Sequence, residues 1–389
     1  MRVGNQEMLL PTTMVGKYPE PRWWKGQAFA KYPGLPGRAV FDSISEEAYN
    51  DCIQSMVRDQ ERAGLDITAD GRVFDGEDSY GQLLYHYIER LSGYELNGPN
   101  LAVPIYSMLY APTCVGEVRR RYPFHLETLK AMRRSTDRPI KISYTGVGAI
   151  TAATNDVYYK DIKELGLAIA KAMNEDFKEL AGIGVDIIQM DEFVWPYGMG
   201  DWEIDCLNAA VKDVDAQIWL HVCWGNLGSS PSYLPYEGDA EHKDTDGIYD
   251  VARRPRGATE ATERARNIFP KVLGADIDVL NYEVGRMGPD DLKPLADNNW
   301  DKPFVAGVID VKQVTVETAE EVADRIRNVM EFVPIEKLGV TTDCGLPNLK
   351  RWIAQLKLVA LVEGADIVRA ENSDQSARPT TDQPPVNTL

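Results

Sequence analysis

A histidine and two cysteines in two short, widely separated stretches are the residues whose types and spacing could do chemistry. His221 and Cys223 end the apolar run 217–223, and Cys344 follows the apolar run 338–341. Side chains alternate along a strand, so His221 and Cys223 would project from the same face. An imidazole and two thiolates form a donor set for zinc that leaves room for a further ligand or a substrate. The stretches predict one zinc ion (Zn2+) per chain if the strand ends meet; otherwise the cysteines are ordinary small core residues.

Short β-like runs alternate with amphipathic segments along the chain, which is the pattern of a parallel sheet with connecting helices. The runs end near Val15, Asp70, Thr145, Asp191, Cys223, Glu283, Val311 and Cys344. The clearest helical segments are 46–63, 161–181 and 319–332, the last with Thr318 as a plausible N-cap. Eight strand-helix units predict a single (β/α)8 TIM-type barrel of the α/β class over residues 1–370, and residues 101–106 predict an accessory strand.

In such a barrel the functional side chains lie at the carboxyl ends of the strands. This rule places the zinc donors around one mouth, together with the polar residues that end the other strands. Residues 225–255 are rich in Gly, Ser, Pro, Asp and Tyr and are predicted to form a lid that carries His242. A surface insertion would have the same composition. The polar, Pro-rich stretch 371–389 is predicted to be a disordered tail.

Composition and charge exclude several classes of partner. The chain has 389 residues and a net charge of −18, which argues against nucleic acid and against anionic membrane surfaces. It has no apolar run of transmembrane length, and residues 1–11 do not have the pattern expected of a secretion signal. Five cysteines at wide spacings do not form a disulfide framework, so a cytoplasmic protein with reduced thiols is expected. Barrels of this size are often homo-oligomers, which the sequence leaves open.

Four motifs, taken in order, resemble the C-terminal domain of cobalamin-independent methionine synthase. They are Gln189-Met190-Asp191-Glu192, His221-x-Cys223, Glu283 and Asp343-Cys344-Gly345-Leu346. Residues 11–16 and 307–312 fit the same family, and the resemblance covers roughly residues 10–370. It implies a (β/α)8 barrel with zinc at the mouth, held by His221, Cys223, Glu283 and Cys344. The spacing from Cys223 to Glu283 is longer here than in the synthases.

The metal implies the chemistry. A free thiol has a pKa near 8.5 and is mostly protonated at neutral pH, whereas a thiol on zinc becomes a positioned thiolate. The thiolate then attacks an electrophilic carbon. The resemblance therefore implies two small partners, a thiol and an electrophile, that are joined into a thioether.

Two departures from the synthases concern the head group of the thiol. Lys17 and Arg72 stand where the synthases usually carry a Ser and a Glu that hold the carboxylate and ammonium of homocysteine. An arginine would repel an ammonium and would suit an anion such as a sulfonate. Alternatively, both cations form ion pairs with neighbouring carboxylates and touch no substrate. Asp191, which helps to bind the amino group in the synthases, is kept here; it could also structure the mouth or pair with Arg72.

The stretch 17–24, with Arg22 in a Tyr-Pro-x-Pro-Arg-Trp-aromatic run, looks like one branch of the family. This branch, the epoxyalkane:coenzyme M transferases (2-hydroxypropyl-coenzyme M lyases), joins coenzyme M to short epoxides. The resemblance implies sulfonate binding by Lys17, Arg72 and Arg22. Ring opening leaves an alkoxide that needs a proton, and Tyr144, Tyr282, His242 and Asp191 are the candidate donors.

Other functions stay open at this point. The close rival is methyl transfer from methyltetrahydrofolate or a methylcorrinoid to homocysteine, which gives methionine. A non-catalytic zinc-binding protein, with a closed donor shell, is a rival from another class. A decarboxylase on the same barrel would have no need for His221, Cys223 and Cys344 together.

Overall fold

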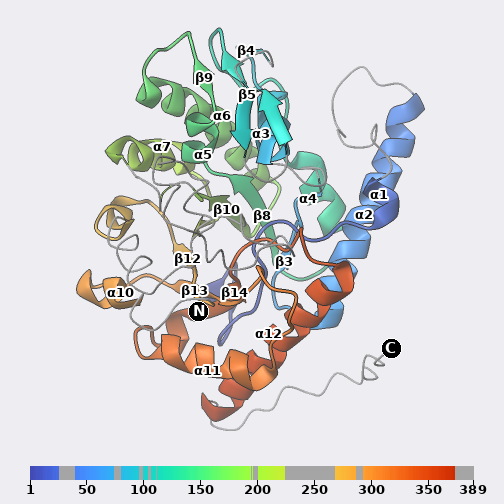
Figure 1. The fold of residues 1–389 in the computed structure, drawn as a ribbon, viewed down its shortest axis with the longest axis vertical. Helices are drawn as coiled ribbons and strands as arrows, with labels where there is room; N and C mark the ends of the chain where they lie inside the picture. The colour runs from blue at the N-terminus through green and yellow to red at the C-terminus, as the bar shows by residue number, and fades with distance from the viewer. Residues whose placement is uncertain are drawn as a thin grey trace, which may run out of the picture.

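Seven parallel strands form one curved sheet, in the order β14-β13-β12-β11-β10-β8-β3 (Figure 1). The strands are β3 (Thr68–Ala69), β8 (Ile140–Thr145), β10 (Ile187–Asp191), β11 (Gln217–Val222), β12 (Val279–Glu283), β13 (Phe304–Ile309) and β14 (Leu338–Thr342). The computed structural model describes residues 1–25, 40–73, 80–95, 100–103, 107–110, 112–193, 195, 200–223, 268–285 and 292–372. The predicted strand ends from Asp70 to Cys344 are confirmed to within about two residues, which is the usual uncertainty of an element boundary.

The extended segment after Pro11 occupies the place of the eighth strand. Thr12 bridges Val340 in parallel, and the Thr13 amide donates to the Val340 carbonyl at 3.1 Å. On its other side, the amides of Asp66 and Ile67 both donate to the Thr12 carbonyl at 3.1 Å. The segment thus lies between β14 and the residues directly before β3. This contact closes the sheet into the predicted TIM-type barrel.

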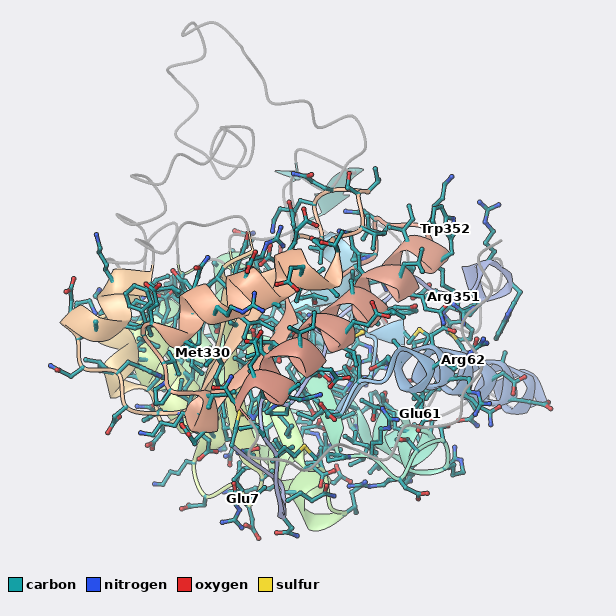
Figure 2. The ribbon with its side chains drawn as sticks, turned by 90° about the horizontal axis from the view of Figure 1, so that it is seen from below. Glu7, Glu61, Arg62, Met330, Arg351 and Trp352 are labelled. Atoms are coloured by element: carbon teal, nitrogen blue, oxygen red, sulfur yellow. The ribbon has the colours of Figure 1, made fainter. Side chains whose placement is uncertain are left out.

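Helices cover the outside of the sheet. They include α2 (Val40–Ala63), α4 (Leu126–Arg133), α6 (Ile162–Gly182), α7 (Asp201–Val211), α11 (Ala319–Met330) and α12 (Arg351–Asn372). Two predicted helix starts are confirmed: Asp161 caps α6 by accepting from the Lys163 and Glu164 amides, and Thr318 caps α11. Figure 2 shows α11 and α12 side by side, with Arg351 and Trp352 at the N-terminal end of α12.

Shorter elements lie outside the barrel wall. They are β1 (Arg2–Val3), β2 (Gln6–Glu7), β4 (Tyr94–Glu95), β5 (Asn100–Val103), β6 (Ser107–Tyr110), β7 (Thr113–Cys114), β9 (Asn155–Asp156), α1 (Arg22–Lys25), α3 (Tyr80–Ile88), α5 (Val147–Ala152) and α10 (Lys293–Asp297), with 3₁₀ turns at Lys271–Gly274 and Ile335–Lys337. The predicted accessory strand corresponds to β5, which pairs with β6 in an antiparallel hairpin.

Two predicted segments lie wholly or mostly outside the described residues. Residues 225–255, the predicted lid, lie outside them entirely. Of the predicted tail 371–389, the first two residues belong to α12, which ends at Asn372, and the rest lie outside the described part. Within the described part of the chain, none of the helices has the length and apolar character needed to cross a bilayer.

The inside of the barrel changes from apolar to polar along its axis. At the amino ends of the strands, Trp219, Ile187, Val279 and Val305 pack with Met1 and Val3 of the N-terminal hairpin. One layer higher, the Lys141 ammonium donates to Gln189 Oε1 at 2.8 Å, and the Asn281 amide donates to the same oxygen at 3.2 Å. At the carboxyl ends, the same faces present Asp191, His221 and Glu283. The apolar plug closes one end, and the polar groups converge at the other.

Candidate functional site

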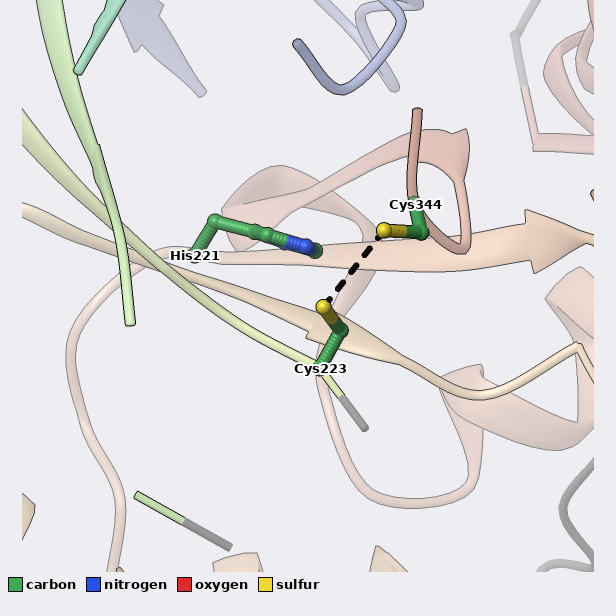
Figure 3. A group of neighbouring side chains, drawn as sticks. All are labelled: His221, Cys223 and Cys344. Atoms are coloured by element: carbon green, nitrogen blue, oxygen red, sulfur yellow. Dashed lines mark hydrogen bonds between the residues drawn. The ribbon is translucent and has the colours of Figure 1, made fainter. Parts of the chain in front are cut away.

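His221, Cys223 and Cys344 come together at the carboxyl end of the barrel (Figure 3). One ligand atom from each residue can be chosen so that all three lie within 4.8 Å of one another, and the two sulfur atoms are 3.6 Å apart. We call these three residues the donor group. His221 and Cys223 are 1% exposed, and Cys344 is partly exposed. The central prediction from the sequence, that two strand ends 121 residues apart meet, is confirmed.

Strand pairing and one glycine bring Cys344 to this point. β11 pairs with β12, β12 with β13 and β13 with β14. In a closed barrel, the ends of β11 and β14 therefore face each other across the opening of the barrel. Asp343 crosses over the end of β13 at Gly307, where an added Cβ would lie 2.8 Å from the Asp343 Cα atom. A larger residue at position 307 would therefore displace the backbone at Asp343, directly before Cys344.

The donor group fits a zinc ion. Apart from its interaction with the Cys344 thiol, the buried His221 has no hydrogen-bond partner among the described residues, so at least one of its ring nitrogens is unsatisfied there. The hydrogen bond from Cys223, with further help from His221, lowers the pKa of the Cys344 thiol to about 5. The same hydrogen bond raises the pKa of Cys223. A neutral imidazole and thiolate sulfur are the ligands that zinc prefers, and a metal would satisfy these buried groups together.

Glu283, the fourth predicted ligand, is not a member of the donor group. Its Oε1 atom accepts from the Lys312 ammonium at 2.6 Å, and both side chains are buried. Its charge is nevertheless close enough to contribute to the raised pKa of Cys223, after the larger effects of the Cys344 hydrogen bond and burial. Ligation by Glu283 therefore stays a prediction.

Arg72 and Asp191 form a buried ion pair at the same mouth. Arg72 Nη1 lies 2.8 Å from Asp191 Oδ2, and its Nη2 donates to the Thr145 hydroxyl. Asp191 Oδ1 accepts from the Gln189 amide at 2.8 Å. Gly16 approaches the pair closely, since an added Cβ would lie 3.2 Å from Arg72 Cδ and 3.3 Å from Asp191 Oδ2. The pairing of Asp191 with Arg72 that the sequence allowed is confirmed.

Lys17 connects this ion pair to the Cys344 loop. Its ammonium donates to Glu20 Oε1 at 2.9 Å and to the Arg72 carbonyl at 3.2 Å. Its own carbonyl accepts from the Leu346 amide at 2.7 Å, two residues after Cys344. The Lys17 backbone therefore lies against the loop that follows Cys344, and both cations have a carboxylate partner, as the alternative interpretation of the sequence expected.

The structure does not connect the two remaining predicted site residues, Arg22 and His242, with the donor group. Arg22 is exposed on α1, and the neighbouring Trp24 is buried with its indole nitrogen 3.4 Å from the Val73 carbonyl. His242 lies outside the described residues. The placement of Arg22 and His242 at the site stays a prediction.

Tyr144 and Tyr282 face away from the mouth, which corrects the suggestion that either is the proton donor. The Tyr144 hydroxyl donates to Asp176 Oδ2 on α6 at 2.5 Å, and its ring packs against Phe177. Burial, followed by the Asp176 charge, raises the pKa of Tyr144 well above its usual value. Tyr282 packs on Phe269 and Phe304 on the outer face of β12. Alternation along the strand explains this: Ser143 and Thr145 face the interior, so Tyr144 cannot.

Replacing Tyr144 with phenylalanine is expected to lower the free energy of unfolding by about 1–3 kcal/mol, because the buried Asp176 loses a donor. Turnover of the folded enzyme should change less than about twofold, since this hydroxyl is remote from the mouth. Denaturant unfolding and steady-state kinetics on the same preparation measure both. A loss of turnover with unchanged stability would return Tyr144 to the list of proton donors.

Sequence reasoning gave no role to two buried lysines. Lys312 ends the stretch 307–312 that fits the family, and Lys141 is the one charged residue in the run Ile140–Thr145. Lys141 is fully buried, donates to the Met14 carbonyl at 2.7 Å and lies over the Trp219 ring. Burial lowers its pKa to about 7. A lone lysine in a fully buried strand was the available signal for a charged group inside the barrel.

Comparisons with known proteins agree with this geometry. The family model described as "Cobalamin-independent synthase, Catalytic domain" matches residues 10–234 and 261–366. A protein of Xanthobacter autotrophicus named 2-hydroxypropyl-CoM lyase is 48% identical over 380 residues, which cover 95% of this chain and 98% of the relative. A methionine synthase of Saccharolobus solfataricus is 30% identical and covers 93% of this chain and 96% of its own length.

Solved structures show the same architecture. A B12-independent methionine synthase from Shewanella sp. W3-18-1, in complex with selenomethionine, superposes with a TM-score of 0.72 at 29% identity. The match covers 94% of this chain and 99% of that one. The family model matches most of the chain, and the matches to the two relatives cover nearly the whole length of both proteins. The chain therefore belongs to the cobalamin-independent synthase catalytic-domain family, and it is an enzyme of that family.

Proposed function

We propose that this enzyme is a zinc-dependent thiol alkyltransferase that joins coenzyme M to short-chain epoxides, giving 2-hydroxyalkyl-coenzyme M. The observation that carries the proposal is the position of Arg72. Its buried guanidinium contacts Asp191 and Thr145 at the ends of two strands, and its backbone carbonyl accepts from the Lys17 ammonium. The name of the relative from Xanthobacter autotrophicus supports the same thiol and the same kind of product.

In this proposal the donor group holds the zinc ion, and Glu283 is the predicted fourth ligand. When bound, zinc supplies a positive charge that lowers the pKa of the substrate thiol. His221 and Cys223 are buried and Cys344 is only partly exposed, which limits the access of water to the donor group. Excluding water strengthens the electrostatic interactions there.

Arg72 and Lys17 bind the sulfonate in this proposal. A guanidinium offers five N–H donors in a planar fork, and a sulfonate offers three acceptor oxygens. Asp191 and Thr145 hold two corners of that fork in place, at Nη1 and Nη2. Because Arg72 is already oriented by these contacts, less entropy is lost when an anion binds.

The reaction forms a carbon–sulfur bond and breaks a carbon–oxygen bond of the epoxide ring. The leaving oxygen stays on the product and takes up one proton, which gives the hydroxyl group. Both carboxylate oxygens of Asp191 already accept hydrogen bonds, from Gln189 and Arg72, so its geometry suits positioning of Arg72. His242 then remains as the predicted proton donor.

Methyl transfer to homocysteine is the second candidate function. Asp191, which binds the amino group in the synthases by resemblance, is present at the mouth, and methionine synthases are among the relatives. In this chain, however, Asp191 faces a guanidinium at 2.8 Å. An incoming ammonium would have to compete with that buried cation for the same carboxylate.

Product analysis with the zinc-loaded enzyme tests the proposal. One reaction contains coenzyme M and epoxypropane, and the other contains homocysteine and a methyltetrahydrofolate. We expect 2-hydroxypropyl-coenzyme M from the first and no methionine from the second. Methionine formation without the thioether would replace the proposal with the second candidate. If neither product forms and zinc X-ray absorption shows no new sulfur ligand on adding either thiol, the zinc site is structural.

A further inference from the structure

A fully buried lysine lies one layer below the barrel mouth and has no role in the function described so far. The Lys141 ammonium donates to the Met14 carbonyl at 2.7 Å and to Gln189 Oε1 at 2.8 Å, and it lies 5.3 Å from the centre of the Trp219 ring. The two oxygens and the ring face are all acceptors, and an ammonium has three N–H donors. Burying a charge is costly even when it is paired, so a lysine in the interior of the barrel points to a role beyond packing.

Gln189 connects Lys141 with the mouth. Its Oε1 atom accepts from the Lys141 ammonium and, at 3.2 Å, from the Asn281 amide. Its Nε2 atom donates to Asp191 Oδ1 at 2.8 Å. An ammonium can only donate, so it requires the oxygen end of the Gln189 amide, and the nitrogen end must then face Asp191. Lys141 thus decides which end of this amide the Asp191 carboxylate meets.

The orientation of the Gln189 amide matters for the ion pair at the mouth. Asp191 Oδ1 accepts from Gln189, and Oδ2 accepts from Arg72 Nη1 at 2.8 Å. Asp191 and Thr145 are paired in register at the ends of β10 and β8, and Thr145 accepts from the other nitrogen of Arg72, Nη2. If the Gln189 amide were reversed, its oxygen would face the Asp191 carboxylate, and two acceptors at this distance repel each other. The carboxylate would then have to move, and Arg72 would lose one of these two contacts.

Lys141 is also within electrostatic reach of Asp191. Burial lowers the pKa of Lys141 to about 7, and the Asp191 charge, followed by that of Asp70, acts in the opposite direction. A lysine that acted on the mouth only through its charge would do so with or without Gln189. A lysine that orients the Gln189 amide would act only when Gln189 is present.

We propose that Lys141 is a positioning residue that fixes the orientation of the Gln189 amide, and that it thereby holds Asp191 and Arg72 in the arrangement that selects an anionic head group on the thiol. This inference rests on the proposed function and deepens it, since it assigns part of the selectivity for the sulfonate to a residue one layer below the mouth. A residue behind a binding group contributes in this way when its contacts leave that group a single favourable geometry.

A double-mutant cycle tests this role through the selectivity for the head group. The zinc-loaded wild type, Lys141→Met, Gln189→Met and the double variant are titrated calorimetrically with two thiols. One is coenzyme M, and the other is 2-mercaptoethanol, which has a hydroxyl in place of the sulfonate. In Lys141→Met we expect coenzyme M to bind about 10-fold weaker or more, and 2-mercaptoethanol to stay within about threefold of the wild type. In the Gln189→Met background, Lys141→Met should change coenzyme M affinity less than about twofold.

Two controls accompany the cycle. Zinc content should be the same in all four proteins, because the donor group consists of other residues. Lys357 is a matched buried lysine, which donates to the Thr315 carbonyl at 2.6 Å and to Glu317 Oε2 at 2.7 Å. Lys357→Met should keep coenzyme M affinity within about twofold of the wild type. If it lowered this affinity as much as Lys141→Met, general loosening of the barrel would be the cause, and the proposal would be wrong.

Two results of the cycle would overturn the role of Lys141. The first is wild-type selectivity for coenzyme M over 2-mercaptoethanol in Lys141→Met. The second is an effect of Lys141→Met that persists in the Gln189→Met background, since the charge and not the amide orientation would then be the cause. If Lys141→Met does not fold, the double variant decides, because it removes both members of the hydrogen bond and leaves no unpaired ammonium. Wild-type selectivity in the double variant would overturn the proposal, and a loss equal to that of Gln189→Met would support it.

Other outcomes separate this inference from the proposed function. If the wild type prefers homocysteine to coenzyme M, the proposed function is wrong, and the cycle is repeated with homocysteine. A loss of homocysteine affinity in Lys141→Met that is absent in the Gln189→Met background would keep Lys141 as the residue that positions Asp191, and no loss would overturn that role as well. If the wild type binds neither thiol better than 2-mercaptoethanol, both the proposed function and the role of Lys141 are wrong.

Discussion

Replacing Cys344 with alanine is expected to weaken zinc binding by more than about 100-fold, the upper end of the loss seen when only an outer-sphere partner of a metal ligand is removed. Cys344 is the member of the donor group that follows β14, and the hydrogen bond from Cys223 lowers the pKa of its thiol, which favours the thiolate that binds a metal. Zinc content after dialysis against a competing chelator measures the change. Thioether formation should fall with zinc occupancy.

A second cysteine provides the matched control for this prediction. Cys206 is fully buried on α7 against α6 and is not a member of the donor group. Cys206→Ala should keep full zinc content. The thermal midpoint gives an independent readout, because a ligand that binds only the folded state raises it: added zinc should stabilise Cys206→Ala and the wild type, and not Cys344→Ala. Full zinc retention in Cys344→Ala would remove the donor group from the proposal.

Replacing Arg72 with glutamine is expected to weaken coenzyme M binding at least about 30-fold, while homocysteine binding changes less than a few-fold. The estimate follows from the cost of about 2–5 kcal/mol when one partner of a buried, hydrogen-bonded charge pair is truncated. Glutamine keeps a donor for Asp191 or Thr145 and removes only the charge and the fork. Calorimetric titration of the zinc-loaded variants with each thiol measures both affinities.

Two other substitutions at Arg72 sharpen the comparison. Arg72→Lys keeps the charge without the planar fork and should lie between the wild type and Arg72→Gln. Arg72→Glu, combined with Asp191→Asn to avoid facing carboxylates, should favour homocysteine, because an anion at this position suits an ammonium. Coenzyme M affinity that is the same in the wild type and Arg72→Gln would mean that Arg72 only structures the mouth with Asp191.

The arrangement of the barrel follows closely from local sequence. Short apolar runs that end in polar residues predict buried parallel strands, because both faces of such strands are covered. The starts of α6 and α11 were readable since Asp161 and Thr318 supply the side-chain oxygens that the first helical amides need. His221 and Cys223 could be placed on one face from the two-residue period of the strand alone.

The sequence does not show which side chains of each strand point into the barrel and which point toward the helices. In β8 the residues from Ile140 to Thr145 are all buried, so burial does not distinguish the inner face from the outer one. Tyr144 therefore looked like a mouth residue, whereas the fold turns it toward Asp176 on α6. In a strand with one solvated face, polar and apolar residues alternate and show which face is buried. β8 is buried on both faces, so its sequence lacks this alternation.

By itself, the sequence determined the residue types that can bind zinc, the strand ends that carry them and the presence of cations where the related synthases have other residues. Only the tertiary structure decided the partners of those cations. Arg72 meets Asp191 across 119 residues, and Lys312 meets Glu283 across 29. The physical reason is that a charge's partner depends on distance in space, and in a closed barrel the strand ends brought together at one mouth come from every part of the chain.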